Sequence, residues 1–210
     1  MNRRRLVTRV KICGITSVTQ AQRCAEFGVD ALGVNFVSSS PRRVDENTAA
    51  AIVRAVGSKV LVVGVVAGLD VAQMRSLRGR TGVGCLQLHG EERITDVTAL
   101  LPHAYKAVRI AAASDVALAE AMPGVYVMVD AKVDGTLGGT GRTFDWSLVA
   151  SLATKRRLVL AGGLSPENVA HAVACVRPFC VDVASGVEKE PGVKDWERVK
   201  AFVDAVRIAA

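Results

Sequence analysis

Two predicted strands end on side chains that can move protons. The apolar stretch 9–13 ends on Cys13, which is followed by a glycine and by helix-capping hydroxyls. A second apolar stretch, 125–129, runs into Asp130 and then into the glycine-rich segment 134–141. Because a thiol and a carboxyl group at matching strand ends can act as base and acid, the pattern indicates a site for proton transfer.

The elements that must position these groups recur along the whole chain. Short runs rich in Val, Leu and Ile are each followed by Gly, Ser or Asp and then by a stretch with helical spacing, which is typical of parallel strands in βα units. Eight strands are predicted to end, 21 to 31 residues apart, at Cys13, Phe36, Val66, Leu88, Arg109, Asp130, Ala161 and Ala184.

This spacing predicts an α/β fold in which a single (β/α)8 TIM barrel domain spans residues 1–210. An open doubly wound sheet is the alternative, but eight evenly spaced units with no spare segment favour closure. Active sites of such barrels lie at the C-terminal ends of the strands. The polar and small residues that follow strands would therefore converge there: Cys13, Arg42, His89, Arg109, Asp130, Gly162, Gly163, Ser185 and Gly186.

Helix signals lie between the predicted strands. Ser165 is a candidate cap with Pro166 at the first helical position, and Ala49, Ile52, Val53 and Val56 have helical spacing. The last helix carries one apolar stripe, which predicts packing on the outside of the barrel: Trp196, Val199, Phe202, Val203 and Val206.

Composition narrows the class of protein. Half of the residues are apolar, yet no run is long enough to span a membrane and none follows the basic N-terminus as a signal-peptide core, so we expect a cytoplasmic protein. The five cysteines form no C-x-x-C pair and the three histidines are isolated, which argues for reduced thiols and against a metal site. The net charge of +7 suits a polyanion or a small phosphorylated, carboxylated substrate, but only 4% of the residues are aromatic, which argues against nucleic-acid binding.

Glycines after the seventh and eighth strands indicate an anion site. Gly162 and Gly163 follow one strand, and Ser185 and Gly186 follow the other. Barrels of this class commonly bind phosphate there through backbone N–H groups, and small residues permit the close approach.

Six motifs in order resemble the phosphoribosylanthranilate isomerase family of tryptophan biosynthesis. They are KICGIT at 11–16, QLHGE at 87–91, DAK at 130–132, GGTGRTFDW at 138–146, LAGGL at 160–164 and VDVASGVE at 181–188. The resemblance covers nearly the whole chain. It implies an Amadori rearrangement of N-(5-phosphoribosyl)anthranilate to 1-(2-carboxyphenylamino)-1-deoxyribulose 5-phosphate, with no metal or redox cofactor, by a monomer or homodimer.

The resemblance also assigns roles to residues. Asp130 matches the general acid that protonates the furanose ring oxygen, and Cys13 matches the general base that removes the C2 proton. Arg42 matches the arginine that holds the anthranilate carboxylate. His89 is expected in the wall of the substrate site, and Asp182 binds a substrate hydroxyl or braces the loop after the eighth strand.

The chemistry sets conditions on the two proton-transfer groups. A thiol titrates near pH 8.5, so only a few per cent would be thiolate at pH 7, and Lys11, the first turn of the following helix or other cations must raise that fraction. Asp130 must hold a proton at neutral pH, which burial or the field of the substrate phosphate would favour.

Simpler interpretations exist for each group taken alone. Cysteine is among the most buried residue types, so Cys13 could fill the core, and Asp130 could cap a turn. Arg42 and Arg43 could be a solvated pair. Arg43 stands where an aromatic residue is common in the family, and Asn35 where an apolar one is, which leaves the substrate range open.

Two other functions compete with the isomerase. The isomerase of histidine biosynthesis performs the same rearrangement with paired aspartates, but Cys13 takes the place of one of them. A non-catalytic barrel that binds a phosphorylated ligand would need neither Cys13 nor Asp130.

Overall fold

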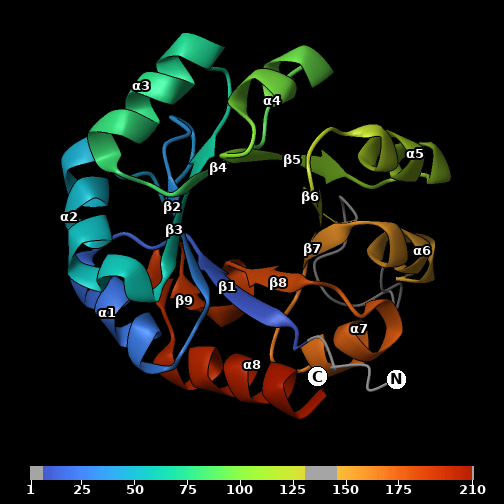
Figure 1. Ribbon diagram of the computed structural model, residues 1–210. Helices are drawn as coiled ribbons and strands as arrows, with labels where there is room; N and C mark the ends of the chain where they lie inside the picture. The colour runs from blue at the N-terminus through green and yellow to red at the C-terminus, as the bar shows by residue number, and fades with distance from the viewer. Residues whose placement is uncertain (1–6, 131–145, 210) are drawn as a thin grey trace.

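The computed structural model describes residues 7–130 and 146–209. Strands and helices alternate along these residues (Figure 1). The eight barrel strands are β1 (Arg9–Cys13), β2 (Ala31–Asn35), β3 (Leu61–Val66), β4 (Cys85–Leu88), β5 (Ala104–Arg109), β6 (Tyr126–Asp130), β7 (Arg157–Ala161) and β8 (Cys180–Val183). The helices are α1 (Val18–Glu26), α2 (Glu46–Val56), α3 (Val71–Thr81), α4 (Ile94–Leu100), α5 (Ala113–Ala121), α6 (Ser147–Lys155), α7 (Val169–Val176) and α8 (Trp196–Ala209).

The eight strands form a closed parallel barrel, as predicted. Each strand pairs with the next in the chain, and β8 pairs with β1, where Lys11 lies opposite Asp182. The alternative of an open sheet is therefore wrong. Cys13 is paired with Gly33 of β2, which places the predicted base at the C-terminal rim.

Most strand ends agree with the predicted positions, and two differ by one residue. The second strand ends at Asn35 rather than Phe36, and the eighth at Val183 rather than Ala184. Phe36 N–H still donates to the Val65 carbonyl at 2.9 Å, so the ladder continues one bond beyond the assigned strand.

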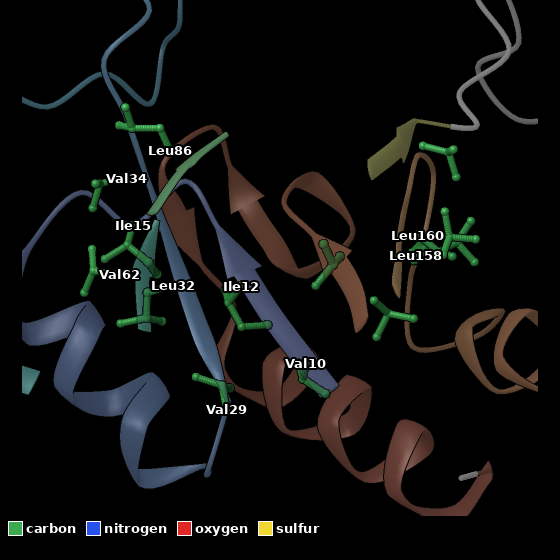
Figure 2. Close-up of a cluster of buried hydrophobic side chains, with 14 of the residues drawn as sticks. Val10, Ile12, Ile15, Val29, Leu32, Val34, Val62, Leu86, Leu158 and Leu160 are labelled. Atoms are coloured by element: carbon green, nitrogen blue, oxygen red, sulfur yellow. The ribbon is translucent and has the colours of Figure 1, made fainter. Parts of the chain in front are cut away.

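Apolar side chains fill two layers. Those on the outer face of the strands, Ile12 and Leu32 among them, pack under the ring of helices (Figure 2). Inside the barrel a smaller cluster includes Val63, Tyr105 and Met128. The two layers follow from the period-2 alternation of side chains along each strand.

The helix faces agree with their apolar spacing. Helix α2 buries Ala49, Ile52 and Val56, with Val53 partly buried against the same core. Helix α8 buries the predicted stripe except Trp196, which is partly buried: Val199, Phe202, Val203 and Val206.

The predicted start of α7 is wrong. The helix begins at Val169, not at Pro166, because residues 166–168 form a turn. Asn168 and Val169 both donate backbone N–H groups to the Ser165 carbonyl, so the turn leads directly into the helix. Ser165 therefore opens the turn rather than capping the helix.

A short hairpin that the sequence analysis does not predict follows β8. A 3-10 turn, η2 (Ser185–Val187), leads into β9 (Glu188–Glu190), which pairs antiparallel with β10 (Val193–Lys194). The chain then enters α8. Over 7–130 and 146–209, none of the helices combines the length and apolar character that crossing a bilayer requires.

Candidate active site

A cavity of about 310 Å³ opens at the C-terminal ends of the barrel strands. Its lining includes nearly all of the residues that the sequence predicts for the site: Cys13, His89, Asp130, Gly162, Gly163, Asp182, Ser185 and Gly186. Arg42 and Arg109 are the exceptions, and neither lines this cavity. Arg109 lines a neighbouring cavity that shares His89 and Asp130 with the first.

Cys13 lies beside Gly33 of β2. A Cβ atom at Gly33 would lie 2.7 Å from Cys13 Sγ and 3.1 Å from Lys11 Nζ, so only glycine leaves room for both groups. The thiol and the ammonium group therefore sit together over the Gly33 backbone.

Opposing effects act on the pKa of the Cys13 thiol. Burial raises the pKa of Cys13 above its ordinary value, and Asp182 adds to the rise. Lys11 and Lys194 act in the predicted direction and lower the pKa, but burial outweighs them. The two lysines therefore act on the thiol as expected, but burial keeps its pKa above the ordinary value.

A buried polar network lies beneath Cys13. Lys11 is fully buried and donates to Asp182 Oδ2 at 2.9 Å and to Gln87 Oε1 at 3.0 Å. Tyr105 donates its hydroxyl to the same Gln87 oxygen at 3.0 Å. Lys11 is held as an ammonium group, since Asp182 and its other polar neighbours raise its pKa although burial opposes them.

The network fixes the tautomer of His89. Because Gln87 Oε1 accepts two hydrogen bonds, its Nε2 must be the donor to His89 Nδ1, 3.2 Å away. The hydrogen on a neutral His89 ring is then on Nε2, which lies 4.0 Å from Asp130 Oδ2. Burial lowers the pKa of His89, so the ring is neutral at pH 7.

Asp130 ends β6 and is half-buried at the cavity wall. Its register pairs it with Ala161 of β7 and Arg109 of β5. The glycine-rich segment 134–141 and the motif residues 131–132 and 138–145 lie outside the described residues.

The loops after β7 and β8 form a backbone-lined wall. Gly162 and Gly163 have φ values of +95° and +63°, which favour glycine. A Cβ atom at Gly186 would collide with the Leu164 carbonyl oxygen, so these loops are in direct contact. Arg198 ties them further, because it donates to the Gly186 carbonyl at 2.9 Å and to Glu167 at 3.0 Å.

The two carboxylate oxygens of Asp182 differ in their hydrogen bonding. Its Oδ2 is paired with Lys11, whereas Oδ1 is buried and has no hydrogen-bond partner among the described residues. A buried carboxylate oxygen without a partner is costly, and Asp182 lines the cavity. The arrangement suits a ligand group that donates a hydrogen bond.

Arg42 binds a protein carboxylate in this structure. Its Nε lies 3.0 Å from both oxygens of Glu188, and its Nη2 lies 2.6 Å from Glu188 Oε2. Its side chain runs over Gly14, whose Cβ would lie 2.5 Å from Arg42 Cδ. Arg43, by contrast, is exposed. The two arginines are therefore not a solvated pair, because only Arg43 faces solvent.

Several residues of the site were not identified from the sequence as contributors. Gln87, Glu188 and Lys194 each contact a predicted site residue. Gln87 carried one signal, since it is a polar side chain inside an otherwise apolar strand. Pro191-Gly192, a turn dipeptide, marked the hairpin that carries the other two. Asn35, noted as unusual, lines the cavity and accepts from Val37 N–H at 2.8 Å.

The described residues hold no group of three or more His, Cys, Asp or Glu side chains that could bind a metal. The five cysteines are all free. The groups that line the cavity and can do chemistry include a thiol, two carboxylates and the backbone of the rim loops.

Comparison with known proteins identifies the family. The family model described as N-(5'-phosphoribosyl)anthranilate (PRA) isomerase matches residues 10–205. N-(5'-phosphoribosyl)anthranilate isomerase of Pseudomonas aeruginosa strain LESB58 is 45% identical over 201 residues, which cover 95% of each chain.

Solved structures agree. The phosphoribosyl anthranilate isomerase of Thermotoga maritima has a TM-score of 0.85 at 37% identity, covering 95% of this chain and 98% of that one. A structure of such an isomerase in complex with reduced 1-(o-carboxyphenylamino)-1-deoxyribulose 5-phosphate has a TM-score of 0.83 at 34% identity, with the same coverage. The chain therefore belongs to the N-(5'-phosphoribosyl)anthranilate isomerase family.

Proposed function

We propose that the protein converts N-(5-phosphoribosyl)anthranilate to 1-(2-carboxyphenylamino)-1-deoxyribulose 5-phosphate, an aldose–ketose isomerisation of tryptophan biosynthesis. The observation that carries the proposal is the single cavity lined by Cys13, Asp130, Asp182 and the glycines of two rim loops. Family membership over residues 10–205 supports it. So does the product-like ligand of a relative with the same barrel.

The order of the strands suits this substrate. Strands β7 and β8 lie between β6, which carries Asp130, and β1, which carries Cys13. A phosphate held by the N–H groups of the loops after β7 and β8 would bring the attached sugar between the acid and the base. Gly162, Gly163, Ser185 and Gly186 are proposed to supply this site.

The proposed reaction assigns one proton transfer to Asp130 and one to Cys13. Asp130 protonates the furanose ring oxygen, the C1–O bond breaks, and a Schiff base forms with the anthranilate nitrogen. Cys13, as thiolate, removes the C2 proton to give an enolamine. This tautomerises to the ketone as C1 takes up a proton and the hydroxyl on C2 loses one, so that the product is an isomer of the substrate.

Lys11 and Lys194 are proposed to offset the effect of burial on the ionisation of Cys13. Both lower the pKa of a thiol that burial raises. A base of raised pKa is also a stronger proton acceptor once it is ionised, which suits removal of a carbon-bound proton. The two ammonium groups would keep a usable fraction of thiolate in a closed site.

Two further contacts complete the substrate site. We propose that Asp182 Oδ1, which has no partner among the described residues, accepts a hydrogen bond from a ribose hydroxyl. Arg42 is proposed to hold the anthranilate carboxylate, with the two N–H groups on the edge of the guanidinium that Glu188 does not occupy. The wall residue His89 would contact the substrate between Asp130 and Gln87.

A catalytic thiol restricts the setting in which the protein works. We propose the cytoplasm, where reducing conditions keep Cys13 as a thiol. The protein is proposed to be a monomer or a homodimer, and a T. maritima relative is described as dimeric. Light scattering coupled to size-exclusion chromatography would distinguish the two states.

The activity is tested with purified protein and freshly prepared N-(5-phosphoribosyl)anthranilate. We expect enzyme-dependent loss of the anthranilate-type fluorescence together with formation of the carboxyphenylamino product, identified by mass and retention time. Two results would contradict the proposal. One is release of free anthranilate, and the other is loss of substrate no faster with the protein than without it.

A further inference from the structure

The hairpin of β9 and β10 lies against the end of β1. Thr16 Oγ1 and Gln20 Nε2 donate to the Gly192 carbonyl oxygen at 3.0 Å and 2.8 Å. These contacts join the turn of the hairpin to the segment that follows Cys13. The hairpin is therefore attached to the catalytic rim and is not a free appendage.

The hairpin carries two buried charges that face Arg42. Lys194 Nζ lies 2.7 Å from Glu188 Oε1, and Glu188 Oε2 lies 2.6 Å from Arg42 Nη2. The side chains of Lys194 and Glu188 are 0% and 2% exposed. Burial alone would raise the pKa of Glu188, but Arg42 and Lys194 hold it below its ordinary value, so Glu188 is a carboxylate.

Lys194 also binds the backbone of the catalytic base. Its Nζ donates to the Cys13 carbonyl oxygen at 2.5 Å. One ammonium group therefore fixes both the end of β1 and the carboxylate that holds Arg42. One side chain from the loop after β2 and two from the hairpin form one unit, which we name the rim triad: Arg42, Glu188 and Lys194.

The triad orients the guanidinium. Glu188 occupies the edge made by Nε and Nη2, as the three short contacts show. The second edge, made by Nη1 and the other Nη2 hydrogen, has the spacing that a second carboxylate needs for a bidentate pair. Contact of the arginine stem with Gly14 restricts rotation of the side chain.

The triad also keeps the arginine attractive to an anion. An arginine paired with a lone carboxylate would be neutralised, but here the carboxylate is balanced by Lys194. The three side chains together carry a single positive charge, which remains for the ligand.

We propose that Glu188 and Lys194 are positioning residues for the substrate carboxylate, which set the orientation of Arg42 and its distance from Cys13. This inference rests on the proposed function, because it assumes that Arg42 receives the anthranilate carboxylate. Neither residue needs to touch the substrate. Their effect is to present one edge of Arg42 at a fixed place beside the base.

The test compares two ligands that differ in one group. The first is reduced 1-(o-carboxyphenylamino)-1-deoxyribulose 5-phosphate, and the second is the phenylamino analogue without the carboxylate. Binding of each is measured by titration calorimetry on the whole protein and on Glu188→Gln, Lys194→Met, the double variant and Arg42→Met. Exposed residues of the same hairpin give matched controls, Glu190→Gln and Lys189→Met.

We expect Glu188→Gln and Lys194→Met each to weaken the carboxylate-bearing ligand by about 10- to 100-fold, the loss typical of one charge-assisted contact. The analogue should bind within about threefold of wild type, and the controls should behave as wild type for both ligands. For Glu188→Gln, KM for the substrate should rise more than kcat falls. Lys194→Met also removes a charge that lowers the pKa of Cys13, so its kcat should fall as well. The double variant restores the net charge of the triad but not its geometry, so it should remain as weak as the single variants.

Three results would overturn the inference. Recovery of wild-type affinity in the double variant would show that charge alone matters. Tighter binding by Glu188→Gln would show that Glu188 competes with the ligand. Equal weakening of both ligands would show a general structural defect. If instead Arg42→Met fails to distinguish the two ligands, the proposed carboxylate site itself is wrong.

Discussion

Cys13 is partly buried among two ammonium groups and a carboxylate, and their balance sets how readily the thiol ionises. Burial and Asp182 raise its pKa, while Lys11 and Lys194 lower it. Because Lys11 is also the partner of Asp182 at 2.9 Å, its charge acts twice, directly on the thiol and by balancing the carboxylate. Lys11 therefore acts on the ionisation of Cys13 in addition to its place in the barrel core.

Lys11→Met should move the limb of the kcat/KM profile that reports ionisation of Cys13 to higher pH. Removal of a positive charge near a thiol raises its pKa further, and each unit lowers the thiolate fraction at neutral pH about tenfold. The same variant should slow alkylation of Cys13 by iodoacetamide at pH 8, followed by mass spectrometry of the peptide that contains it.

Lys106→Met is the matched control for this prediction. Lys106 is another buried lysine, paired with Glu92 at 3.1 Å, but it is not among the principal charges that act on Cys13. The Lys106→Met variant should be less stable than wild type, as Lys11→Met should be. Its rate of Cys13 alkylation should equal that of wild type. An unchanged profile in a folded Lys11→Met protein would remove Lys11 from the account.

At the scale of elements, the loops after β7 and β8 depend on close backbone contact. A methyl group at Gly186 would collide with the Leu164 carbonyl, whereas Gly79, exposed in α3, has open space around it. Gly186→Ala should lower the free energy of unfolding by about 1–3 kcal/mol and weaken binding of ribose 5-phosphate. Gly79→Ala should raise the free energy of unfolding by about 0.5–1 kcal/mol and leave binding unchanged.

Urea denaturation and calorimetry with ribose 5-phosphate measure both effects. Wild-type affinity for ribose 5-phosphate in Gly186→Ala would contradict a phosphate site built on these loops.

The elements differ in how well the sequence predicts them. Apolar runs of four to six residues identify the barrel strands, since a parallel strand buried on both faces needs little else. The hairpin at Glu188–Glu190 and Val193–Lys194 is charged and short, so no apolar pattern marks it. Contacts such as Arg42 with Glu188 join residues far apart in the chain, and only closure of the barrel brings them together.

At the scale of the whole molecule, the last helix closes the ring around the barrel (Figure 1). Helix α8 packs beside α7, and Arg207 near its end donates to the carbonyls of Phe27 and Gly28 at 3.0 Å and 3.3 Å, just after α1. Closure of the helix ring thus accompanies the pairing of β8 with β1. We therefore expect a substitution on the buried face of α8 to change stability more than catalysis.

Phe202→Ala should lower the free energy of unfolding by about 3–5 kcal/mol, because a fully buried ring of α8 is replaced by a cavity. The folded protein should keep its kcat, since Phe202 does not line the active-site cavity. Ile208, which is 86% exposed in the same helix, gives the control. Ile208→Ala should change the free energy of unfolding by less than about 0.5 kcal/mol. Equal losses in the two variants, measured by urea denaturation, would contradict this picture of α8.

The central claim is that Cys13 and Asp130 are the base and acid of one proton-transfer site, and single-turnover kinetics test it most directly. Consumption of N-(5-phosphoribosyl)anthranilate is followed by fluorescence with excess wild-type, Cys13→Ala or Asp130→Asn protein, alongside circular dichroism and binding of the reduced product analogue. Both variants should fold and bind the analogue, with rate constants lowered by roughly 10²- to 10⁴-fold for Cys13→Ala and turnover abolished in Asp130→Asn. Near-normal turnover by either folded variant would contradict the claim.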